Sequence, residues 1–327
     1  MICIGIESTA HTFGIGILKD EKVLSNVKNS YATEKGGMIP SKISEHHINV
    51  FDSTLKRALE DADIGLNEID LVAFSQGPGM GHALRVGANM ARSLSLLLNK
   101  PIIGVNHCIA HLEIGHMLFE LKDPLLLYVS GANTQIIAYS EGKYRIFGET
   151  LDIGVGNFID SLARFMGLGF PGGPELEILA RKGERYIKLP YVVKGMDVSF
   201  GGLLTNLKHK ISQKKYANED IAYSAQETIF AMLMEVTERA MAHCNSRGLI
   251  LGGGVACNKR LQEMSKLMTE DRGVNCYIPE NDLLVDNGAM IAWLGILMHK
   301  SGISCTIESS VIKPYERTDD VTISWNH

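Results

Sequence analysis

The sequence predicts an α/β protein made of a duplicated fold, with two lobes that face each other across a cleft. Three groups of elements occur in the same order in both halves of the 327-residue chain. Glycine-rich loops follow strands and precede helices in both halves, which is typical of parallel β–α units. These repeats place a first lobe at residues 1–124 and a second lobe at residues 125–327.

The first repeated group is a meander of three strands. In the first half, IGIES at residues 4–8 precedes two more short apolar segments, each after a polar turn. In the second half, LLLYVSG at residues 125–131 precedes two similar segments that end at residue 149. Short apolar segments bounded by turn residues predict strands, so each lobe is expected to begin with such a meander.

The second and third groups are strands followed by helices. Residues 69–75 lead into GPGMG and a helix, and residues 248–251 lead into GGG and a helix. KPIIGVN at residues 100–106 precedes a predicted helix at 107–119, and VNCYIPE holds the matching place before DNGAMIAWLGILM. Between these groups, helices are predicted at residues 40–61, 158–182 and 219–246. His47 lies on the apolar face of the first of them, so we interpret it as a core histidine with a hydrogen-bond partner.

Composition limits the class of protein. Hydrophobic residues make up 45% of the chain and charged residues 21%, as in ordinary globular proteins. The six cysteines are scattered, which predicts free thiols in a reducing compartment and a cytoplasmic location. The N-terminus has no signal-peptide pattern, and no apolar stretch approaches the roughly 18 residues of a membrane span.

Net charge limits the kind of partner. A charge of −5 and a pI of about 6.1 argue against a surface that binds nucleic acid over its whole area. Lys208, Lys210, Lys214 and Lys215 form the densest basic cluster, and residues 181–188 add four more cations. Solvated helix surfaces explain both clusters, and a local nucleic-acid patch is the alternative.

NHCIAH at residues 106–111 is a candidate metal site. Asn106 is a favourable N-cap, so His107 and His111 are expected one turn apart on one helix face. Two imidazoles in this arrangement begin many zinc and iron sites; packing or a surface pair is the alternative. Cys108 stands where the H-E-x-x-H motif has its glutamate, so the general base of that motif is missing.

Five other segments are candidates for lining the cleft. GIEST and YVSGAN occupy matching places in the two halves, and such turns either expose N–H groups that bind phosphate or are ordinary hairpin turns. Residues 154–177 carry Asp160 and Glu177 on either side of FPGGP, which suits ribose or adenine recognition, or a plain connection between helices. GGGVACN at residues 252–258 either holds a nucleotide or lets a helix pack closely on a strand. Asp286 in DNGAM is either an N-cap or a group facing the same cleft.

Nine segments together resemble the universal tRNA threonylcarbamoyladenosine transferase family, formerly described as O-sialoglycoprotein endopeptidases. They extend in order over residues 4–295 and are IGIEST, GGMIPSKISEHH, GPGMGHALRVGA, NHCIAH, LYVSGANTQ, DSLARFMGLGFPGGPELE, KGMDVSFGGLLT, GGGVACNKRL and DNGAMIAWLG. The opening IESTAHTFG and the ending PYERTDDVTISW resemble the archaeal and eukaryotic branch of the family.

The resemblance implies a fold and a set of site residues. The fold is actin/hexokinase/heat-shock-ATPase-like, with a nucleotide and metal cleft between the lobes. The metal ligands fall on His107, His111, Tyr128 and Asp286. The nucleotide and substrate contacts fall on Tyr128, Ser130, Gly131, Ala132, Asn133, Asp160, Gly173, Glu177 and Asn258. The implied ion is Fe²⁺ in preference to Zn²⁺. Ala132 and Gly201 stand where the family usually has glycine and serine, and LLVD stands where CTD is common before Asn287; no ligand is lost.

The resemblance also implies a reaction. A threonylcarbamoyl group would pass from threonylcarbamoyl-AMP to N6 of adenosine 37 in tRNAs that read codons starting with A. The N6 lone pair is delocalised into the ring, so catalysis must activate the carbonyl and hold both substrates in line. The implied ligands are the adenylate and ATP or ADP. The implied partners are tRNA and the KEOPS assembly, with its small kinase-like protein and its small dimerising subunit.

Two functions of other classes are weighed against this transferase. One is an ATPase or phosphotransferase of the same superfamily, in which Glu7 would hold a Mg²⁺-bound water. The His-His-Tyr-Asp set argues against it, whereas ATP turnover without tRNA would favour it. The other is a nucleotide-gated scaffold without catalysis, which retained activity in variants of the metal ligands would favour.

Overall fold

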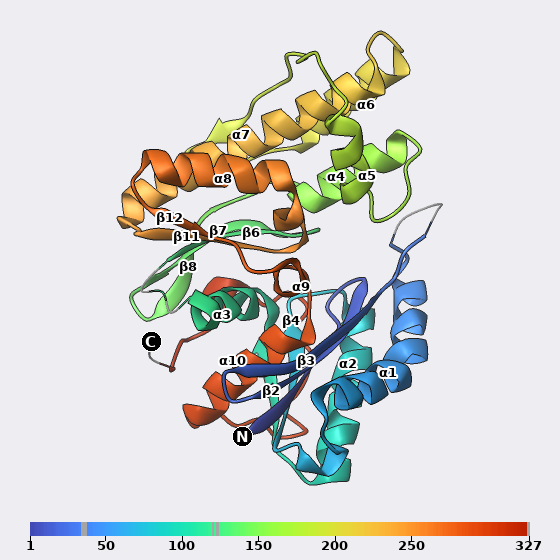
Figure 1. The fold of residues 1–327 in the computed structure, drawn as a ribbon, viewed down its shortest axis with the longest axis vertical. Coiled ribbons are helices and arrows are strands. Elements are labelled where there is room, and N and C mark those ends of the chain that lie inside the picture. Colours follow the sequence, from blue (N-terminus) through green and yellow to red (C-terminus); the bar gives the residue numbers. More distant parts are fainter. Residues whose placement is uncertain (34–37, 120, 122–123, 326–327) are drawn as a thin grey trace.

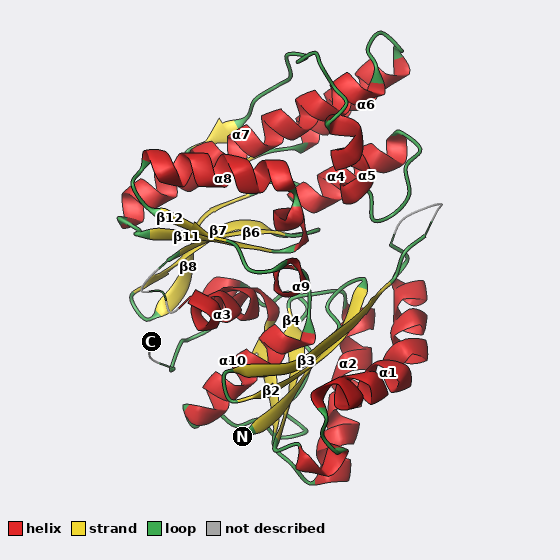
Figure 2. Cartoon of the chain, viewed as in Figure 1, coloured by secondary structure: helices red, strands yellow, loops and turns green. Residues whose placement is uncertain are grey.

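The computed structural model describes residues 1–33, 38–119, 121 and 124–325. The chain forms two lobes, each built on a five-stranded sheet with helices around it (Figures 1 and 2). The first two residues of GGMIPSKISEHH, at positions 36–37, lie outside the described residues. No described helix has both the length and the apolar composition needed to cross a membrane.

The first lobe contains a mixed sheet in the order β3-β2-β1-β4-β5. Strand β1 pairs antiparallel with β2 and parallel with β4, and β4 pairs parallel with β5. The predicted meander is therefore present. The strands are β1 (Ile2–Glu7), β2 (Thr12–Lys19), β3 (Lys22–Ser30), β4 (Leu71–Gly77) and β5 (Ile102–Asn106).

The second lobe repeats this sheet in the order β8-β7-β6-β11-β12. Strand β6 pairs antiparallel with β7 and parallel with β11, and β11 pairs parallel with β12. Equal strand order and equal strand directions confirm the predicted duplication. The strands are β6 (Leu125–Val129), β7 (Thr134–Ser140), β8 (Lys143–Glu149), β11 (Gly248–Gly252) and β12 (Asn275–Tyr277).

The helices of the first lobe cover two faces of its sheet. Helices α1 (Pro40–Ala62) and α2 (Gly81–Leu98) pack against each other on the outer face, where they close a core of aliphatic side chains from the sheet. Helix α3 (His107–Phe119) lies on the opposite face, between the two sheets (Figure 1). His47 of α1 is fully buried and its Nε2 lies 3.0 Å from the carbonyl oxygen of Ala10, which confirms its interpretation as a core histidine with a partner.

Helices cover the outer face of the second sheet as well (Figure 2). They are α4 (Val155–Phe165), α5 (Gly173–Ala180), α6 (Gly201–Ser212), α7 (Asn218–Cys244) and α8 (Lys259–Asp271). The predicted helix over residues 158–182 is wrong for residues 166–172. Gly167 has a φ of +84° there, and Pro171 has no N–H for a helical hydrogen bond, so the helix ends and a second one begins. A two-stranded hairpin of β9 (Val193–Lys194) and β10 (Asp197–Val198) precedes α6.

The last long helix, α10 (Gly288–Lys300), returns to the first lobe, after the short helix α9 (Asn281–Leu284), and packs on β1, β2 and β4. Glycines allow this close approach: a Cβ atom on Gly5 would lie 2.3 Å from the Ala292 nitrogen, and one on Gly16 would lie 2.1 Å from the Ala289 nitrogen. We propose a division into lobes at residues 1–124 and 125–327, in which α10 of the second lobe packs against the sheet of the first.

A pair of backbone hydrogen bonds joins the lobes directly. Thr33 N donates to the Phe170 carbonyl over 3.0 Å, and Phe170 N donates to the Thr33 carbonyl over 2.9 Å. Thr33 follows β3 of the first lobe, and Phe170 lies between α4 and α5 of the second lobe. This interlobe bridge, defined by Thr33 and Phe170, therefore spans the two halves of the duplicated fold.

Candidate metal and nucleotide site

The N-terminus of α3 fixes the two candidate histidines. The Asn106 side-chain oxygen accepts hydrogen bonds from Cys108 N over 3.0 Å and from Ile109 N over 3.2 Å, which confirms the predicted cap. His107 and His111 then lie one turn apart, with ring centroids separated by 4.8 Å. Both side chains are almost completely buried, so this face of α3 points into the molecule and not toward solvent.

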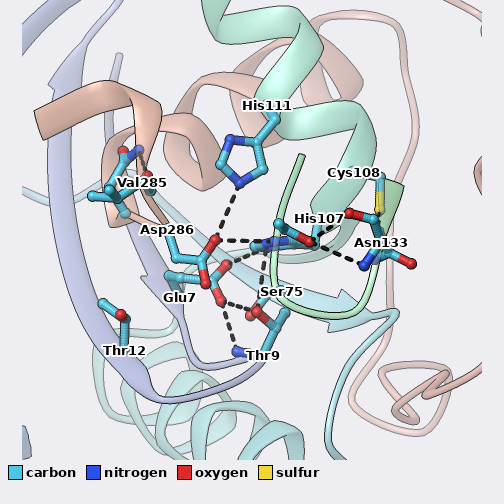
Figure 3. A network of polar contacts seen from close by, with 12 residues as sticks. Glu7, Thr9, Thr12, Ser75, His107, Cys108, His111, Asn133, Val285 and Asp286 are labelled. Carbon is cyan, nitrogen blue, oxygen red and sulfur yellow. Dashed lines mark hydrogen bonds and ion pairs between the residues drawn. The ribbon is translucent and has the colours of Figure 1, made fainter. Parts of the chain in front are cut away.

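His107 is the centre of the polar cluster (Figure 3). Its Nε2 lies 3.1 Å from the Tyr128 hydroxyl and 3.4 Å from Asp286 Oδ1. Its Nδ1 lies 2.9 Å from Glu7 Oε2. Strand β6, the start of α3, strand β1 and the turn before α10 thus each supply one group.

His111 completes the cluster from the next turn of the helix. Its Nε2 lies 3.2 Å from Asp286 Oδ1 (Figure 3), and possible ligand atoms of His107, His111 and Asp286 all lie within 4.8 Å of one another. Ligand atoms held about 2.1 Å from a tetrahedral metal ion lie roughly 3.4 Å apart. The spacings of this donor set therefore fit a metal ion, as does its chemistry of two imidazoles, a carboxylate and a phenol.

Asp286 itself is not an N-cap. The cap of α10 is Asn287, whose side chain accepts a hydrogen bond from Met290 N over 3.0 Å. Asp286 lies one residue earlier, and its carboxylate faces the two histidines (Figure 3). The capping alternative for this residue is therefore wrong, and its side chain is free to act in the cleft.

Burial and charge set the protonation of the cluster. Burial by itself would lower the pKa of His107, but Glu7, Tyr128 and Asp286 hold that pKa well above its ordinary value. Burial lowers the pKa of His111 and raises the pKa of the Tyr128 phenol. Although burial opposes ionisation of Asp286, the two histidines hold its pKa well below its usual range. Buried carboxylates at this point require a positive partner, which a protonated His107 or a metal cation supplies.

The sequence predicts a role for Glu7 only in the phosphotransferase alternative, and its contact with His107 was missed there. Its side chain is fully buried, and Oε1 accepts hydrogen bonds from both the backbone N and the hydroxyl of Thr9, each over 2.6 Å. Oε2 faces His107 Nδ1, as carboxylates do when they accept from a metal-binding histidine and hold its ring in place. Its position in GIEST, at the end of β1, is the signal that pointed to this turn.

A cavity of about 840 Å³ opens beside the cluster and is lined by both lobes. The first lobe contributes the turn after β1 and the loop before α2, including Thr9, His11 and Met80. The residues proposed for nucleotide and substrate contacts all line this cavity, and they are Tyr128, Ser130, Gly131, Ala132, Asn133, Asp160, Gly173, Glu177 and Asn258. Of the four metal candidates, His107, Tyr128 and Asp286 also reach the cavity wall.

The turn after β6 is shaped by its contact with α4. Gly156 N donates to the Ser130 carbonyl over 3.0 Å, and Asn157 N donates to the Gly131 carbonyl over 2.9 Å. A Cβ atom on Gly154 would lie 2.4 Å from the carbonyl oxygens of both Gly131 and Ala132, so only glycine allows this approach. The turn is thereby held at the cavity wall by the helix that carries Asp160.

Three polar side chains on the far wall are already engaged within the protein. Asp160 Oδ1 accepts from Gly172 N over 2.8 Å, and burial raises the pKa of this carboxyl. Glu177 Oε1 accepts from Arg181 over 2.6 Å and from Lys259 N over 3.2 Å. Asn258 caps α8 through its oxygen and donates to Gln226 Oε1 over 3.0 Å. Each of them keeps acceptor capacity for a ligand.

The family model for tRNA N6-adenosine threonylcarbamoyltransferase, TsaD, matches residues 22–293. The chain belongs to this family. A tRNA N6-adenosine threonylcarbamoyltransferase of Thermococcus sibiricus is 56% identical over 325 residues, covering 99% of this chain and all of its own length. One of Thermococcus kodakarensis is 56% identical over 326 residues, covering all of both chains. The activity of this family member is the threonylcarbamoyladenosine modification of tRNA.

Comparison with solved structures identifies the fold of this family member. HypF of T. kodakarensis superposes with a TM-score of 0.63 at 14% identity, over 90% of this chain and 47% of that chain. The activator of 2-hydroxyisocaproyl-CoA dehydratase from Clostridium difficile, with bound ADPNP, superposes with a TM-score of 0.54 at 12% identity, over 94% of this chain and 99% of that chain. Together with the duplicated sheets, these likenesses identify the actin/hexokinase/heat-shock-ATPase-like fold.

Proposed function

We propose that this family member transfers the threonylcarbamoyl group from threonylcarbamoyl-AMP to N6 of adenosine 37 in tRNAs reading codons that start with A. The observation that carries the proposal is the cluster of His107, His111, Tyr128 and Asp286, of which all but His111 line an interlobe cavity of about 840 Å³. That volume lies in the upper part of the range for ligand pockets, about 300–1,000 Å³. It leaves room for an adenylate with its acyl group beside the four side chains.

The metal would be bound by His107, His111, Tyr128 and Asp286. We propose Fe²⁺ in preference to Zn²⁺, because half of the donors are oxygen atoms and no thiolate belongs to the set. An ion bound there would supply Lewis acidity to an oxygen of the bound substrate. Glu7 would keep the His107 ring oriented by accepting from its Nδ1–H, over a contact of 2.9 Å.

The chain's own residues would bind and position the adenylate. The turn at Ser130, Gly131, Ala132 and Asn133 offers small residues at the cavity wall, where backbone groups can approach a phosphate. Asp160, Gly173, Glu177 and Asn258 lie on the wall formed by α4, α5 and the start of α8, where carboxylate and amide groups suit ribose and adenine. Holding donor and acceptor in line is a large part of the catalysis expected here. ATP or ADP would occupy the same cavity.

We further propose that the chain works in the cytoplasm within a KEOPS assembly that includes a small kinase-like protein and a small dimerising subunit. All six cysteines are free, which suits a reducing compartment. The net charge of −5 supports the need for partners, because affinity for tRNA grows with the number of phosphate contacts.

The phosphotransferase alternative is disfavoured by the surroundings of Glu7. Its carboxylate is fully buried, and both of its oxygens are engaged by Thr9 and His107. Glu7 does not belong to the cavity lining among the described residues. A Mg²⁺-bound water in the cavity would therefore not meet this carboxylate.

Two measurements test the proposed site. Purified wild-type chain should carry about one transition-metal ion, and His107→Ala or His111→Ala should lose it because each removes a ligand. Cys108→Ser is the matched control, because Cys108 lies about 100° around the helix from His107.

In single-turnover transfer from threonylcarbamoyl-AMP with saturating tRNA, and with partners present, His107→Ala, His111→Ala and Asp286→Ala should each lose most of the rate. Full metal content in the double histidine variant would contradict the assignment of the metal ligands. Wild-type transfer rates in all three variants would contradict the catalytic role of the site and favour the nucleotide-gated scaffold.

A further inference from the structure

Two basic segments that are separate in the sequence converge on one aromatic ring. Arg185 Cζ lies 6.0 Å from the centroid of the Tyr216 ring, Lys210 Nζ lies 5.3 Å from it and Lys215 Nζ lies 5.6 Å from it. These distances are within the range of cation–π contacts. The loop after α5 and the end of α6 therefore meet in one surface around Tyr216.

A second aromatic group extends this surface along α6. Lys208 Nζ lies 5.8 Å from the ring centroid of Phe165, at the end of α4. Phe165 is 45% exposed and Tyr186 is 52% exposed, so both rings are open to a ligand. We call the set the basic–aromatic surface, and its members are Phe165, Arg185, Tyr186, Lys208, Lys210, Lys215 and Tyr216.

The charge of this surface is opposite to that of the whole chain. Residues 181–188 and 208–220 hold eight lysines and arginines against three carboxylates, in a chain of net charge −5. Among the described residues, Arg185, Lys208, Lys210 and Lys215 have no ion pair with a carboxylate, whereas Arg181 pairs with Glu177 over 2.6 Å. Cations that have no carboxylate partner within the protein are available for an external anion.

The surface is continuous with the wall of the cavity. Glu177 of α5 lines the cavity, and its partner Arg181 begins the basic segment that leads to Arg185. Helices α4, α5 and α6 lie together at one end of the second lobe (Figure 1). A polyanion with one nucleotide in the cavity can therefore continue over this end of the molecule.

We propose that the basic–aromatic surface binds the phosphate backbone and an exposed base of the tRNA arm whose adenosine enters the cavity. This inference rests on the proposed transfer to tRNA. Lysine and arginine bind phosphates without regard to sequence, and exposed aromatic rings stack on unpaired bases, which is how RNA loops are recognised. A surface that combines the two fits RNA in preference to an acidic protein, which would not need the open rings.

The experiment compares two triple variants of the full chain with equal loss of charge. The test variant is Arg185→Gln, Lys210→Gln and Lys215→Gln. The control variant is Lys19→Gln, Lys22→Gln and Lys300→Gln, whose exposed lysines lie at the ends of β2 and α10 and the start of β3; Lys300 pairs with Asp20 over 3.8 Å. Affinity for tRNA is measured by anisotropy over about 0.05 to 0.3 M KCl, and the slope of log K against log salt is compared.

The test variant should reduce the magnitude of that slope by about 2 to 3, because each lost phosphate contact removes about one. The control should change it by less than about 1, since its lysines lie on β2, β3 and α10 and not on the elements that carry the basic–aromatic surface. Lys215→Gln alone should reduce the slope by about one, which shows that the effect does not come from misfolding of the triple variant.

Transfer at saturating tRNA separates this inference from the proposed function. The test variant should transfer at the wild-type rate once tRNA is saturating, because the cluster around His107 is unchanged. An unchanged slope with normal transfer overturns the surface and leaves the transferase in place. An unchanged slope with loss of binding to a partner subunit also overturns it, and assigns the surface to a protein partner.

Discussion

At the scale of single residues, the site depends on how one buried carboxylate orients one imidazole. Glu7 contacts His107 Nδ1 over 2.9 Å and is itself held by two hydrogen bonds from Thr9. The ring therefore presents Nε2 to Tyr128 and Asp286. Such outer partners typically contribute 10–100-fold to metal affinity.

We expect Glu7→Gln to lower metal affinity by about 10-fold or more, because the amide oxygen still accepts a hydrogen bond but no longer carries the charge that favours the oriented ring. Competition dialysis against a chelator measures this affinity. Thr54→Val is the control, since Thr54 is buried but its hydroxyl donates to Val50 within α1. Equal affinities for wild type and Glu7→Gln would remove the orienting role.

His47 makes stability depend on pH. Burial lowers its pKa to about 4, below the 6.5 of the unfolded chain. Between these values the unfolded state binds the proton and the folded state does not, so this contribution is fully present above pH 6.5 and is lost as pH falls toward 4. From these values we expect a loss of about 2 kcal/mol in the free energy of unfolding at pH 5.

Urea denaturation at pH 7 and pH 5 measures this contribution. The His47→Gln variant should lose about 2 kcal/mol less between the two pH values than the wild type does. His82→Gln, at an exposed position, should behave as the wild type does. A wild-type pH dependence in His47→Gln would mean that other groups carry it.

At the scale of elements, the contact of α10 with the first sheet positions a metal candidate. The Cβ atom of Gly16→Ala would lie only 2.1 Å from the backbone nitrogen of Ala289. Overpacking of this kind costs typically 1–3 kcal/mol, and backbone atoms cannot move aside as a flexible side chain does. We expect α10 to shift and Asp286 to move with it, so that Gly16→Ala lowers both stability and metal content.

A matched glycine gives the control. Gly202 lies in the first turn of α6, has no positive φ, and a Cβ atom there would meet nothing within 4 Å. Gly202→Ala should therefore leave stability unchanged or raise it by up to about 1 kcal/mol, through helix propensity. Both variants are compared by urea denaturation and by metal analysis. If Gly16→Ala is destabilised but keeps a normal metal content, the packing of α10 on the first sheet does not position the metal site.

Most elements could be predicted because each carries a local signal. The strand, glycine loop and helix units repeat in both halves, and Asn106 is a cap that can be read from its neighbours alone. Helix α6 was not predicted, because KGMDVSFGGLLT begins with turn residues and its first helical turn is stabilised by a distant group. That group is Asp152, which accepts hydrogen bonds from Ser199, Phe200 N and Gly201 N.

The same distinction applies to the site. The pair His107 and His111 follows from helical spacing, whereas the contact of Glu7 with His107 joins residues 100 apart in sequence. The family resemblance supplied Tyr128 and Asp286, which helical spacing does not predict. Convergence of residues 181–188 with 208–215 on Tyr216 is likewise a tertiary contact that neither segment predicts by itself.

At the scale of the whole molecule, the cavity couples the two lobes through any ligand that contacts both. A nucleotide at about 100 times its Kd should raise the free energy of unfolding by about 2.7 kcal/mol, because only the folded state binds it. Gly131→Val should abolish this gain. The Gly131 position meets only Asn157 Oδ1, at 3.5 Å, so the protein accommodates a Cβ while the larger side chain crowds the cavity. Thermal denaturation with and without ATP measures both. An equal gain in the variant would exclude this wall as the binding site.

The interlobe bridge between Thr33 and Phe170 has a consequence for the timing of turnover. Phe170 and Pro171 on one side, and Ser30 and Met38 on the other, line the cavity next to this bridge. In the proposed transfer, a ligand that enters or leaves by this edge would do so only after both hydrogen bonds have opened. The residence time of any ligand in the cavity would then depend on how often the bridge opens, and less on the contacts of that particular ligand. Opening of the interlobe bridge would then limit ligand exchange by this edge, and a bound ligand would be shielded from water there until the bridge opens.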